Sequence, residues 1–215
     1  MIIKRLNTES ASIGEIAAMM ADKTNGLQTL NVTQINWPEA FPYKPEVKVR
    51  IAHNSNELLL QYEVEEKYTM ANVTEDNGEV WTDSCCECFI SFDETGYYNL
   101  ETTCIGKALF AFRQSRENAH HAEPEIMQTI RRHASLGTEP FSEKVGENKW
   151  NLTVAVPVSA FFGHKIEKLD GVEARLNVYK CGDKLSVPHF VSLYPINFPK
   201  PNFHLPEFFQ AVRFE

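Results

Sequence analysis

The segment EVWTDSCCECFISFD, residues 79–93, has the hydrophobic pattern of a strand but carries a carboxylate in its middle. Because successive strand residues point to opposite faces, Glu87 lies on the face opposite Cys86 and Cys88. Those two cysteines are small and apolar enough to belong to a core. Glu87 needs a polar partner on its own face, which makes it the first candidate for binding chemistry.

Two later segments repeat this arrangement. In YYNLETT, Asn99 and Glu101 share one face of a predicted strand, and in EARLNVYKCGD, Arg175 and Asn177 share a face. Amide, carboxylate and guanidinium groups are suited to paired hydrogen bonds with vicinal hydroxyls. We expect these groups to form a polar floor on a concave sheet face. Trp81, at the start of the first strand, would form an aromatic wall beside that floor.

Simpler interpretations of the same residues stay open. Trp81 could cap the core at a strand edge instead of forming a stacking platform. Glu87 could be paired with Arg175, an interaction worth little if it is exposed. Trp37 and Trp150 are predicted to pack, since they lie beside prolines or inside an apolar alternation.

A short helix is predicted near the start of the chain. Ser12 and Glu15 have the spacing of a capping box, Ile16 and Met20 belong to an apolar stripe, and Gly26 can end the segment. Asp83 is expected to fix a strand or a turn.

From residue 46 onward the pattern is strand after strand. The segments include EVKVRIAH, ELLLQYEVE, CCECFISF, YYNLETTC, KALFAFR, KWNLTVAVP, EARLNVYKC, PHFVSLYP and FFQAVRFE. The DETG between two of them is a good hairpin connection. Residues 114–147 are more polar, with loops and one strand expected around IMQTIRRHAS, and PVSAFFGH is expected to form a helical turn.

Roughly nine or ten short strands predict an all-β, antiparallel sandwich, jelly-roll-like, with a short N-terminal helix. We predict one domain over residues 1–215, in which 1–36 form a helical or extended segment.

Composition narrows the functional classes. The chain has 21 Lys and Arg against 29 Asp and Glu, a net charge of −8 at pH 7, which argues against nucleic acid as a partner. No apolar signal segment or membrane span is visible, so we expect a cytoplasmic protein, or a periplasmic or secreted one if a signal was trimmed. The 5 cysteines are predicted to be mostly reduced and packed as small hydrophobes.

Four motifs occur in order along the chain: Trp-x-Asp-Ser-x-x-Glu, Tyr-Tyr-Asn-x-Glu, Tyr-Lys-Cys-Gly-Asp and Phe-His-x-Pro-x-x-Phe. With them, the chain from about residue 37 to 215 resembles the family 9 carbohydrate-binding modules. It is most similar to free-standing bacterial proteins of that kind, which are DOMON-like β-sandwiches. The resemblance implies a sandwich that binds sugars without cleaving them.

The resemblance also implies which residues hold the sugar. Two aromatic residues grip the terminal, reducing-end sugar, the first falling on Trp81 and the second near Phe203 and His204, while polar side chains bond the hydroxyls. The complete expected set is Trp81, Glu87, Asn99, Glu101, Arg175, Asn177, Phe203 and His204. No catalytic residue, no metal-ligating residue and no cofactor are expected, except that structural calcium stays open through DETG or CGDK.

Two other functional classes stay open. The chain has no tryptophan at the second aromatic position, so it could be a scaffold or interaction protein that has lost sugar binding. Less favoured is a glycan-modifying hydrolase, because neighbouring strands could bring Glu87 and Glu101 to the carboxyl spacing of a glycosidase. The oligomeric state and the identity of the sugar are not predicted.

Overall fold

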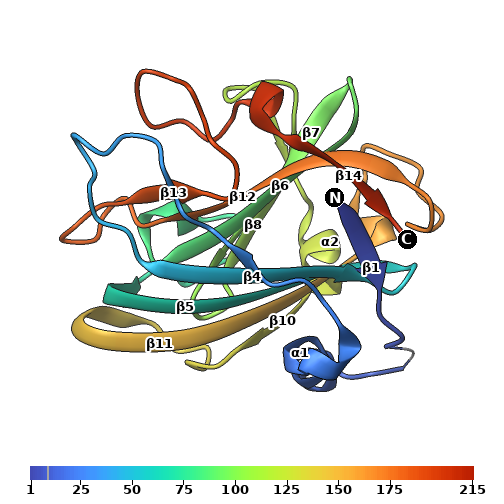
Figure 1. Cartoon of the computed structure of the whole chain (residues 1–215), viewed down its shortest axis with the longest axis horizontal. Coiled ribbons are helices and arrows are strands. Elements are labelled where there is room, and N and C mark those ends of the chain that lie inside the picture. Colours follow the sequence, from blue (N-terminus) through green and yellow to red (C-terminus); the bar gives the residue numbers. More distant parts are fainter. Residues whose placement is uncertain (9) are drawn as a thin grey trace.

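The computed structural model describes residues 1–8 and 10–215, which fold into two facing β-sheets (Figure 1). The first sheet, here called the site sheet, runs in the order β14 (Gln210–Phe214), β12 (Glu173–Cys181), β6 (Cys85–Asp93), β7 (Gly96–Thr103), β8 (Ala108–Arg113) and β9 (Ala119–His121), with β13 (Phe190–Ser192) beside β12 and β3 (Gln34–Ile35) beside β13. The second, the back sheet, runs in the order β10 (Arg131–Ala134), β11 (Phe141–Pro157), β5 (Glu57–Ala71) and β4 (Glu46–His53), with β2 (Leu30–Asn31) beside β4.

Strand β1 (Ile2–Arg5) joins the two sheets. It pairs parallel with β4 of the back sheet and parallel with β14 of the site sheet. The other strand pairs of the described chain are antiparallel. The predicted all-β sandwich is therefore confirmed, although the strand in the first few residues, and its parallel pairing, were not expected.

Helix α1 (Ile13–Ala21) begins at the predicted capping box. The Ser12 hydroxyl accepts from the Glu15 amide at 3.3 Å, and the Glu15 carboxylate accepts from the Ser12 amide at 2.8 Å. Ile16 and Met20 are buried on the outer surface of the back sheet, where they pack with Leu59 and its neighbours. The helix lies below that sheet in Figure 1, so it covers the face remote from the site sheet.

The remaining helical segments are short. They are η1 (Lys23–Asn25), η2 (Val80–Thr82), α2 (Pro124–Thr129), η3 (Val158–Ala160) and η4 (Pro206–Phe208). Gly26 does not end the helix that begins at Ser12, contrary to the expectation from the sequence, because α1 already ends at Ala21; in the left-handed region at φ 64°, Gly26 ends the separate turn η1. η3 is the helical turn expected in PVSAFFGH. The expectation for IMQTIRRHAS was wrong in part, since α2 takes its first residues and only the last ones form β10.

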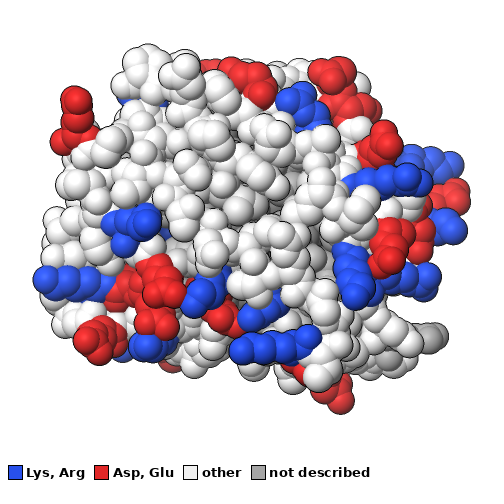
Figure 2. Space-filling view, in the orientation of Figure 1, with Lys and Arg blue, Asp and Glu red and all other residues white. Residues whose placement is uncertain are grey.

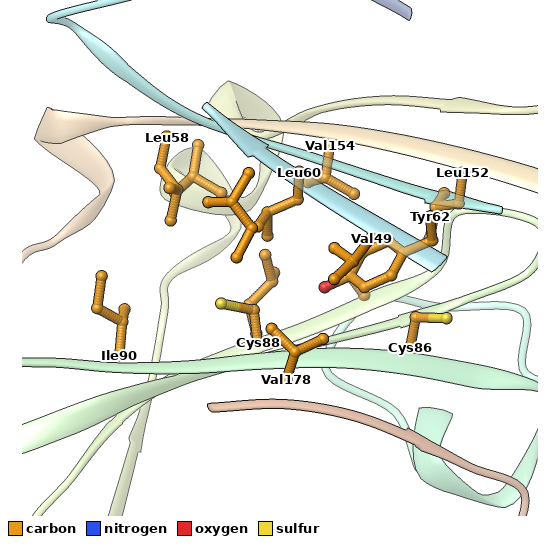
Figure 3. Close-up of a cluster of buried hydrophobic side chains, with 14 of the residues drawn as sticks. Val49, Leu58, Leu60, Tyr62, Cys86, Cys88, Ile90, Leu152, Val154 and Val178 are labelled. Carbon is orange, nitrogen blue, oxygen red and sulfur yellow. The ribbon is translucent and has the colours of Figure 1, made fainter. Parts of the chain in front are cut away.

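The main core lies between the sheets. Cys86, Cys88 and Ile90 point from β6 toward side chains of the back sheet such as Leu60 and Val154 (Figure 3). This confirms the predicted alternation of β6, because these cysteines occupy the core face. All five cysteines are buried and free, as the sequence predicted.

A buried ion pair crosses this core from one sheet to the other. Lys180 of β12 lies 2.7 Å from the Glu66 carboxylate of β5, and both side chains are fully buried. His189 and Trp150 complete the cluster through contacts of 2.8 Å to the lysine and to the carboxylate. Burial lowers the pKa of Lys180, but the attraction and hydrogen bond of Glu66 more than offset it, so the pKa is raised.

The outer face of the site sheet carries a second core. Phe89, Tyr97 and Tyr179 project from this face and are covered by Trp37 and Phe209, which belong to loops outside the sheet. The expectation of an open, polar concave floor was therefore wrong for most of this face. Its physical reason is that aromatic residues alternate onto the same face as the polar ones, and their apolar area must be buried.

Candidate functional site

The second core stops near one end of β6 and leaves a cavity of about 280 Å³. Strands of the site sheet form its floor, and η2 and residues 190–204 form its walls. Its lining combines aromatic, charged and small side chains: Trp81, Glu87, Glu101, Arg113, Arg116, Cys181, Asp183, Phe190, Pro201, Asn202, Phe203 and His204. The volume lies just below the roughly 300–1,000 Å³ typical of small-molecule sites, so it suits a ligand of about one ring.

Two carboxyl groups lie side by side on the floor. Glu87 and Glu101 are direct partners in the antiparallel register of β6 and β7, and both are almost fully buried. Burial, with the neighbouring Glu101, raises the pKa of Glu87 well above its usual range, and burial also raises the pKa of Glu101. A protonated carboxyl can both donate and accept hydrogen bonds. Within the described chain, the Oε2 atom of Glu101 has no hydrogen-bond partner, so the floor offers a free polar group.

A buried amide holds the charged groups of the floor in place. The Asn99 side chain donates to Glu101 Oε1 at 2.8 Å and accepts from Arg113 Nε at 2.8 Å. Asn99 itself is fully buried and does not line the cavity. Its role is to orient the carboxyl and the guanidinium that do.

The aromatic wall is positioned by a turn. Asp83 Oδ2 accepts from the amides of Asn72 and Val73, both at 2.8 Å, and this anchors the end of η2. The predicted structural role of Asp83 is confirmed. On the other side, the Asp183 amide donates to the carbonyl of Trp81 at 3.1 Å. Trp81 is half-buried, and its indole borders the cavity.

The opposite wall carries Phe203 and His204. Phe203 stacks on Tyr179, with ring centroids 4.2 Å apart and planes 10° apart, so one of its faces is already covered. The His204 Nδ1 atom lies 3.0 Å from the Tyr97 hydroxyl. Burial lowers the pKa of His204 to about 3, which leaves the ring neutral at pH 7.

Five of the eight predicted binding residues border this one cavity: Trp81, Glu87, Glu101, Phe203 and His204. Asn99 lies directly behind it. The remaining two, Arg175 and Asn177, do not line the cavity. Arg175 donates to the backbone carbonyl of Phe209 at 3.1 Å, and Asn177 donates to the backbone carbonyl of Tyr194 at 3.2 Å. They lie on the expected face but farther along β12, where the chain after β13 covers Asn177, whereas Arg175 is exposed. The alternative pairing of Glu87 with Arg175 is also wrong.

Several lining residues were missed. Arg113 ends the segment KALFAFR and pairs in register with Tyr97, so alternation along that segment would have placed it on the same face as Glu101. Asp183 belongs to a quoted motif, and partial desolvation raises its pKa to about 6. Arg116 and residues 201–202 lie in loops, and no local pattern in the sequence places them.

One cluster of the described residues has the donors of a metal site. The ligand atoms of Cys85, Glu87 and Cys181 lie within 4.8 Å of one another, and all three residues are buried. Across residues 1–8 and 10–215 it is the one such group of His, Cys, Asp and Glu side chains. Its two thiols do not fit calcium, which prefers oxygen ligands. In DETG, Asp93 Oδ1 accepts two bonds from Thr95, and structural calcium there or in CGDK stays a prediction.

Two negative observations concern other partners. On the face shown in Figure 2, basic and acidic residues are interspersed, and those described there form no continuous basic surface. None of the helices in the described residues has the length and apolar character needed to cross a membrane.

A β-sandwich with a small aromatic and acidic cavity on one sheet has the architecture of a ligand-binding module. The model of the family described as "Carbohydrate-binding family 9" matches residues 15–214, and the chain therefore belongs to that family. The family consists of non-catalytic binding modules. No functionally curated protein matches the chain significantly.

Solved structures of similar proteins agree with this assignment. A protein of Bacteroides uniformis to which carbohydrate binding is ascribed is 40% identical, with a TM-score of 0.95, and the match covers 100% of this chain and 98% of that one. A family 9 module of Caldicellulosiruptor kristjanssonii in complex with glucose is 11% identical, with a TM-score of 0.63 and coverage of 100% and 95%. A family 9 module from the same organism in complex with cellotriose is 12% identical, with a TM-score of 0.61 and coverage of 100% and 94%. At 11% and 12% identity, the similarity to the two Caldicellulosiruptor modules shows a shared fold.

Proposed function

We propose that this chain binds a mono- or oligosaccharide, without cleaving it, in the cavity between Trp81 and Phe203. The terminal sugar, with its reducing end in the site, would enter between the two aromatic walls. Family membership supports carbohydrate as the ligand class, and so do the glucose and cellotriose complexes of the Caldicellulosiruptor modules. A cavity that accommodates about one ring supports recognition of a chain end over recognition of a long glycan stretch.

The observation that carries the proposal is the combination of groups in that cavity. A half-buried indole borders a floor of two buried carboxyls, one of which has a free oxygen. The aromatic faces would contact the C–H groups of the sugar, and Glu87, Glu101 and Arg113 would bond its hydroxyls. Water bonds those hydroxyls almost as well, so single-sugar affinity is expected to be roughly micromolar to millimolar.

The proposal is tested by titration calorimetry against a panel of glucose, galactose, mannose, xylose and cellobiose. Reduction of cellobiose to its alditol removes the reducing end, so loss of binding to the alditol would report recognition of that end. Trp81→Ala should weaken binding at least about tenfold, or roughly 1.4 kcal/mol. Leu136→Ala is the matched control, because Leu136 is an exposed apolar residue that does not line the cavity.

Two results would contradict the proposal. Absence of heat with every sugar and with longer oligosaccharides would favour the scaffold alternative, in which the sandwich has lost its ligand. That alternative has one observation in its favour, namely that Tyr179 already covers one face of Phe203. Release of reducing sugar that Glu87→Gln abolishes would instead identify a hydrolase.

A further inference from the structure

Two thiols and a carboxylate converge at the back of the cavity floor. Cys85 of β6 and Cys181 of β12 are direct partners in register, and Glu87 follows two residues later on the same face of β6. The Cys181 Sγ atom lies 2.9 Å from Glu87 Oε1, and the three ligand atoms lie within 4.8 Å of one another. In the tetrahedral geometry of zinc, ligands roughly 2.0–2.3 Å from the ion stand about 3.3–3.8 Å apart, so side-chain movements of about 1 Å would complete the site.

The cluster lacks a positive charge. Glu87 is only 2% exposed, so water hardly reaches it, and none of the ion pairs among the described residues involves it. The nearby cations are engaged elsewhere: Lys180 points to the other face of β12 and bonds Glu66, and Arg113 bonds Asn99. A divalent cation would therefore supply the opposite charge that Glu87 needs in order to be ionised at this depth, and low polarity strengthens that attraction.

A second observation indicates that something is missing beside this cluster. Glu101 lies directly opposite Glu87 in the register of β6 and β7, is 3% exposed, and presents an Oε2 atom that no donor of the described chain contacts. An unpartnered polar atom at this depth is uncommon in native proteins. Glu101 would accept from a water held at the open position of a bound ion.

The donor types select the metal. Thiolates favour zinc and other soft or borderline ions over calcium and magnesium, which prefer oxygen. Glu87 and Cys181 line the cavity, so an ion could enter from solvent and keep one open position facing it. Cys86 and Cys88 cannot contribute, because they point into the main core.

We propose that Cys85, Glu87 and Cys181 form a zinc site whose open coordination position faces the cavity. Zinc binding displaces the thiol protons of Cys85 and Cys181, together with any proton held by the Glu87 carboxyl, to solvent, so affinity for the ion rises with pH. The inference goes beyond the proposed function and does not depend on it, although both use Glu87.

The test uses the full chain, reduced with a phosphine and freed of metal by a chelator. Zinc is titrated against a chromogenic competitor, and cobalt is used as a spectroscopic probe. We expect one zinc per chain and a thiolate-to-cobalt charge-transfer band. Cys85→Ala and Cys181→Ala should each weaken zinc binding more than about 100-fold. Replacing a residue that only hydrogen-bonds to a metal ligand typically costs roughly 10–100-fold, so a larger loss indicates a direct ligand. Cys88→Ala, on the same strand but in the main core, is the matched control and should retain both signals.

Absence of bound zinc in the reduced wild-type chain would overturn the inference, as would binding that survives both substitutions. Circular dichroism on each variant shows whether it has folded, and Glu87→Gln gives a third variant that keeps both thiols. In it, the charge-transfer band should persist while zinc affinity falls. Sugar titration of the metal-free protein is a separate measurement, so failure of the carbohydrate proposal and failure of the zinc proposal remain distinguishable.

Discussion

Asn99 and Asn177 offer a matched pair for separating stability from binding. Both are fully buried asparagines on neighbouring parts of the site sheet, and the prediction compares their alanine variants, Asn99→Ala and Asn177→Ala. Asn99 bonds two charged groups of the cavity, Glu101 and Arg113. Asn177 bonds backbone groups outside the cavity, namely the amide of Val178 and both backbone groups of residue 194. The two substitutions therefore remove similar numbers of hydrogen bonds with different consequences for the site.

The magnitudes follow from these partners. Hydrogen bonds to charged groups contribute about 1.5–3 kcal/mol each, so losing the two of Asn99 should lower the free energy of unfolding by roughly 3–6 kcal/mol. Neutral hydrogen bonds contribute about 1 kcal/mol each, so Asn177→Ala should cost about 3 kcal/mol. Urea unfolding at pH 7 measures both values.

Sugar affinity should distinguish the two variants. Asn99→Ala frees the Glu101 carboxyl and the Arg113 guanidinium to adopt other rotamers, and this loss of preorganisation should weaken binding about tenfold or more. Asn177→Ala should change the dissociation constant less than about twofold, because its partners lie outside the cavity. Equal weakening by both variants, or no weakening by Asn99→Ala, would refute the assignment of Asn99 as the residue that positions the floor.

Three further predictions concern stability. Lys180→Met leaves the Glu66 carboxylate buried without its cation and should cost about 3–5 kcal/mol in urea unfolding, most of which the double variant Lys180→Met with Glu66→Gln should recover. Burial holds the pKa of His204 at about 3, below the 6.5 of the unfolded chain, so its contribution to stability is complete above pH 6.5 and is lost as the pH falls toward 3. His204→Asn can keep the bond to Tyr97 and should reduce the loss of stability between pH 6.5 and 5 by about 1–2 kcal/mol, seen as a shallower pH dependence of the urea midpoint. Ser12→Ala removes the helix cap and should cost about 1 kcal/mol, with a matching fall in melting temperature.

The fold was predictable because its determinants are local. Alternation along β6 and along β7 assigns Glu87 and Glu101 each to the polar face of its own strand. Their direct pairing was less predictable, because an irregularity between Ile90 and Asp93 shifts the register by one residue from the one that the two-residue turn alone would give. The capping box of α1 is contained within four residues. Strand β1 was missed because four residues with a mixed pattern give no signal, and its pairing depends on two distant strands.

The site was only partly predictable because its limits are set by tertiary structure. Asn177 and Glu87 lie on the same face of the site sheet, and the strand sequences do not indicate which part of that face the loops leave uncovered. The chain after β13 decides this, since the carbonyl of residue 194 accepts from Asn177 and the ring of Phe203 stacks over Tyr179. Loop paths of this kind depend on contacts far apart in sequence, which periodicity does not encode.

The same face of the site sheet thus has to satisfy two opposing demands. Phe89 and Tyr179 require cover, whereas Glu87 and Glu101 lose hydration when they are covered, and the raised pKa of each carboxyl reflects that cost. A ligand suited to this position must provide hydrogen-bond donors and acceptors without adding negative charge, and must offer an apolar surface to the neighbouring aromatic rings. A neutral pyranose meets both requirements, since its equatorial hydroxyls point outward around the ring and its axial C–H groups make both ring faces apolar. An acidic sugar would place its carboxylate beside two buried carboxyls, but Arg113 and Arg116 also line the cavity, so the affinity of a neutral sugar compared with that of its uronic acid shows which pair of groups dominates the site.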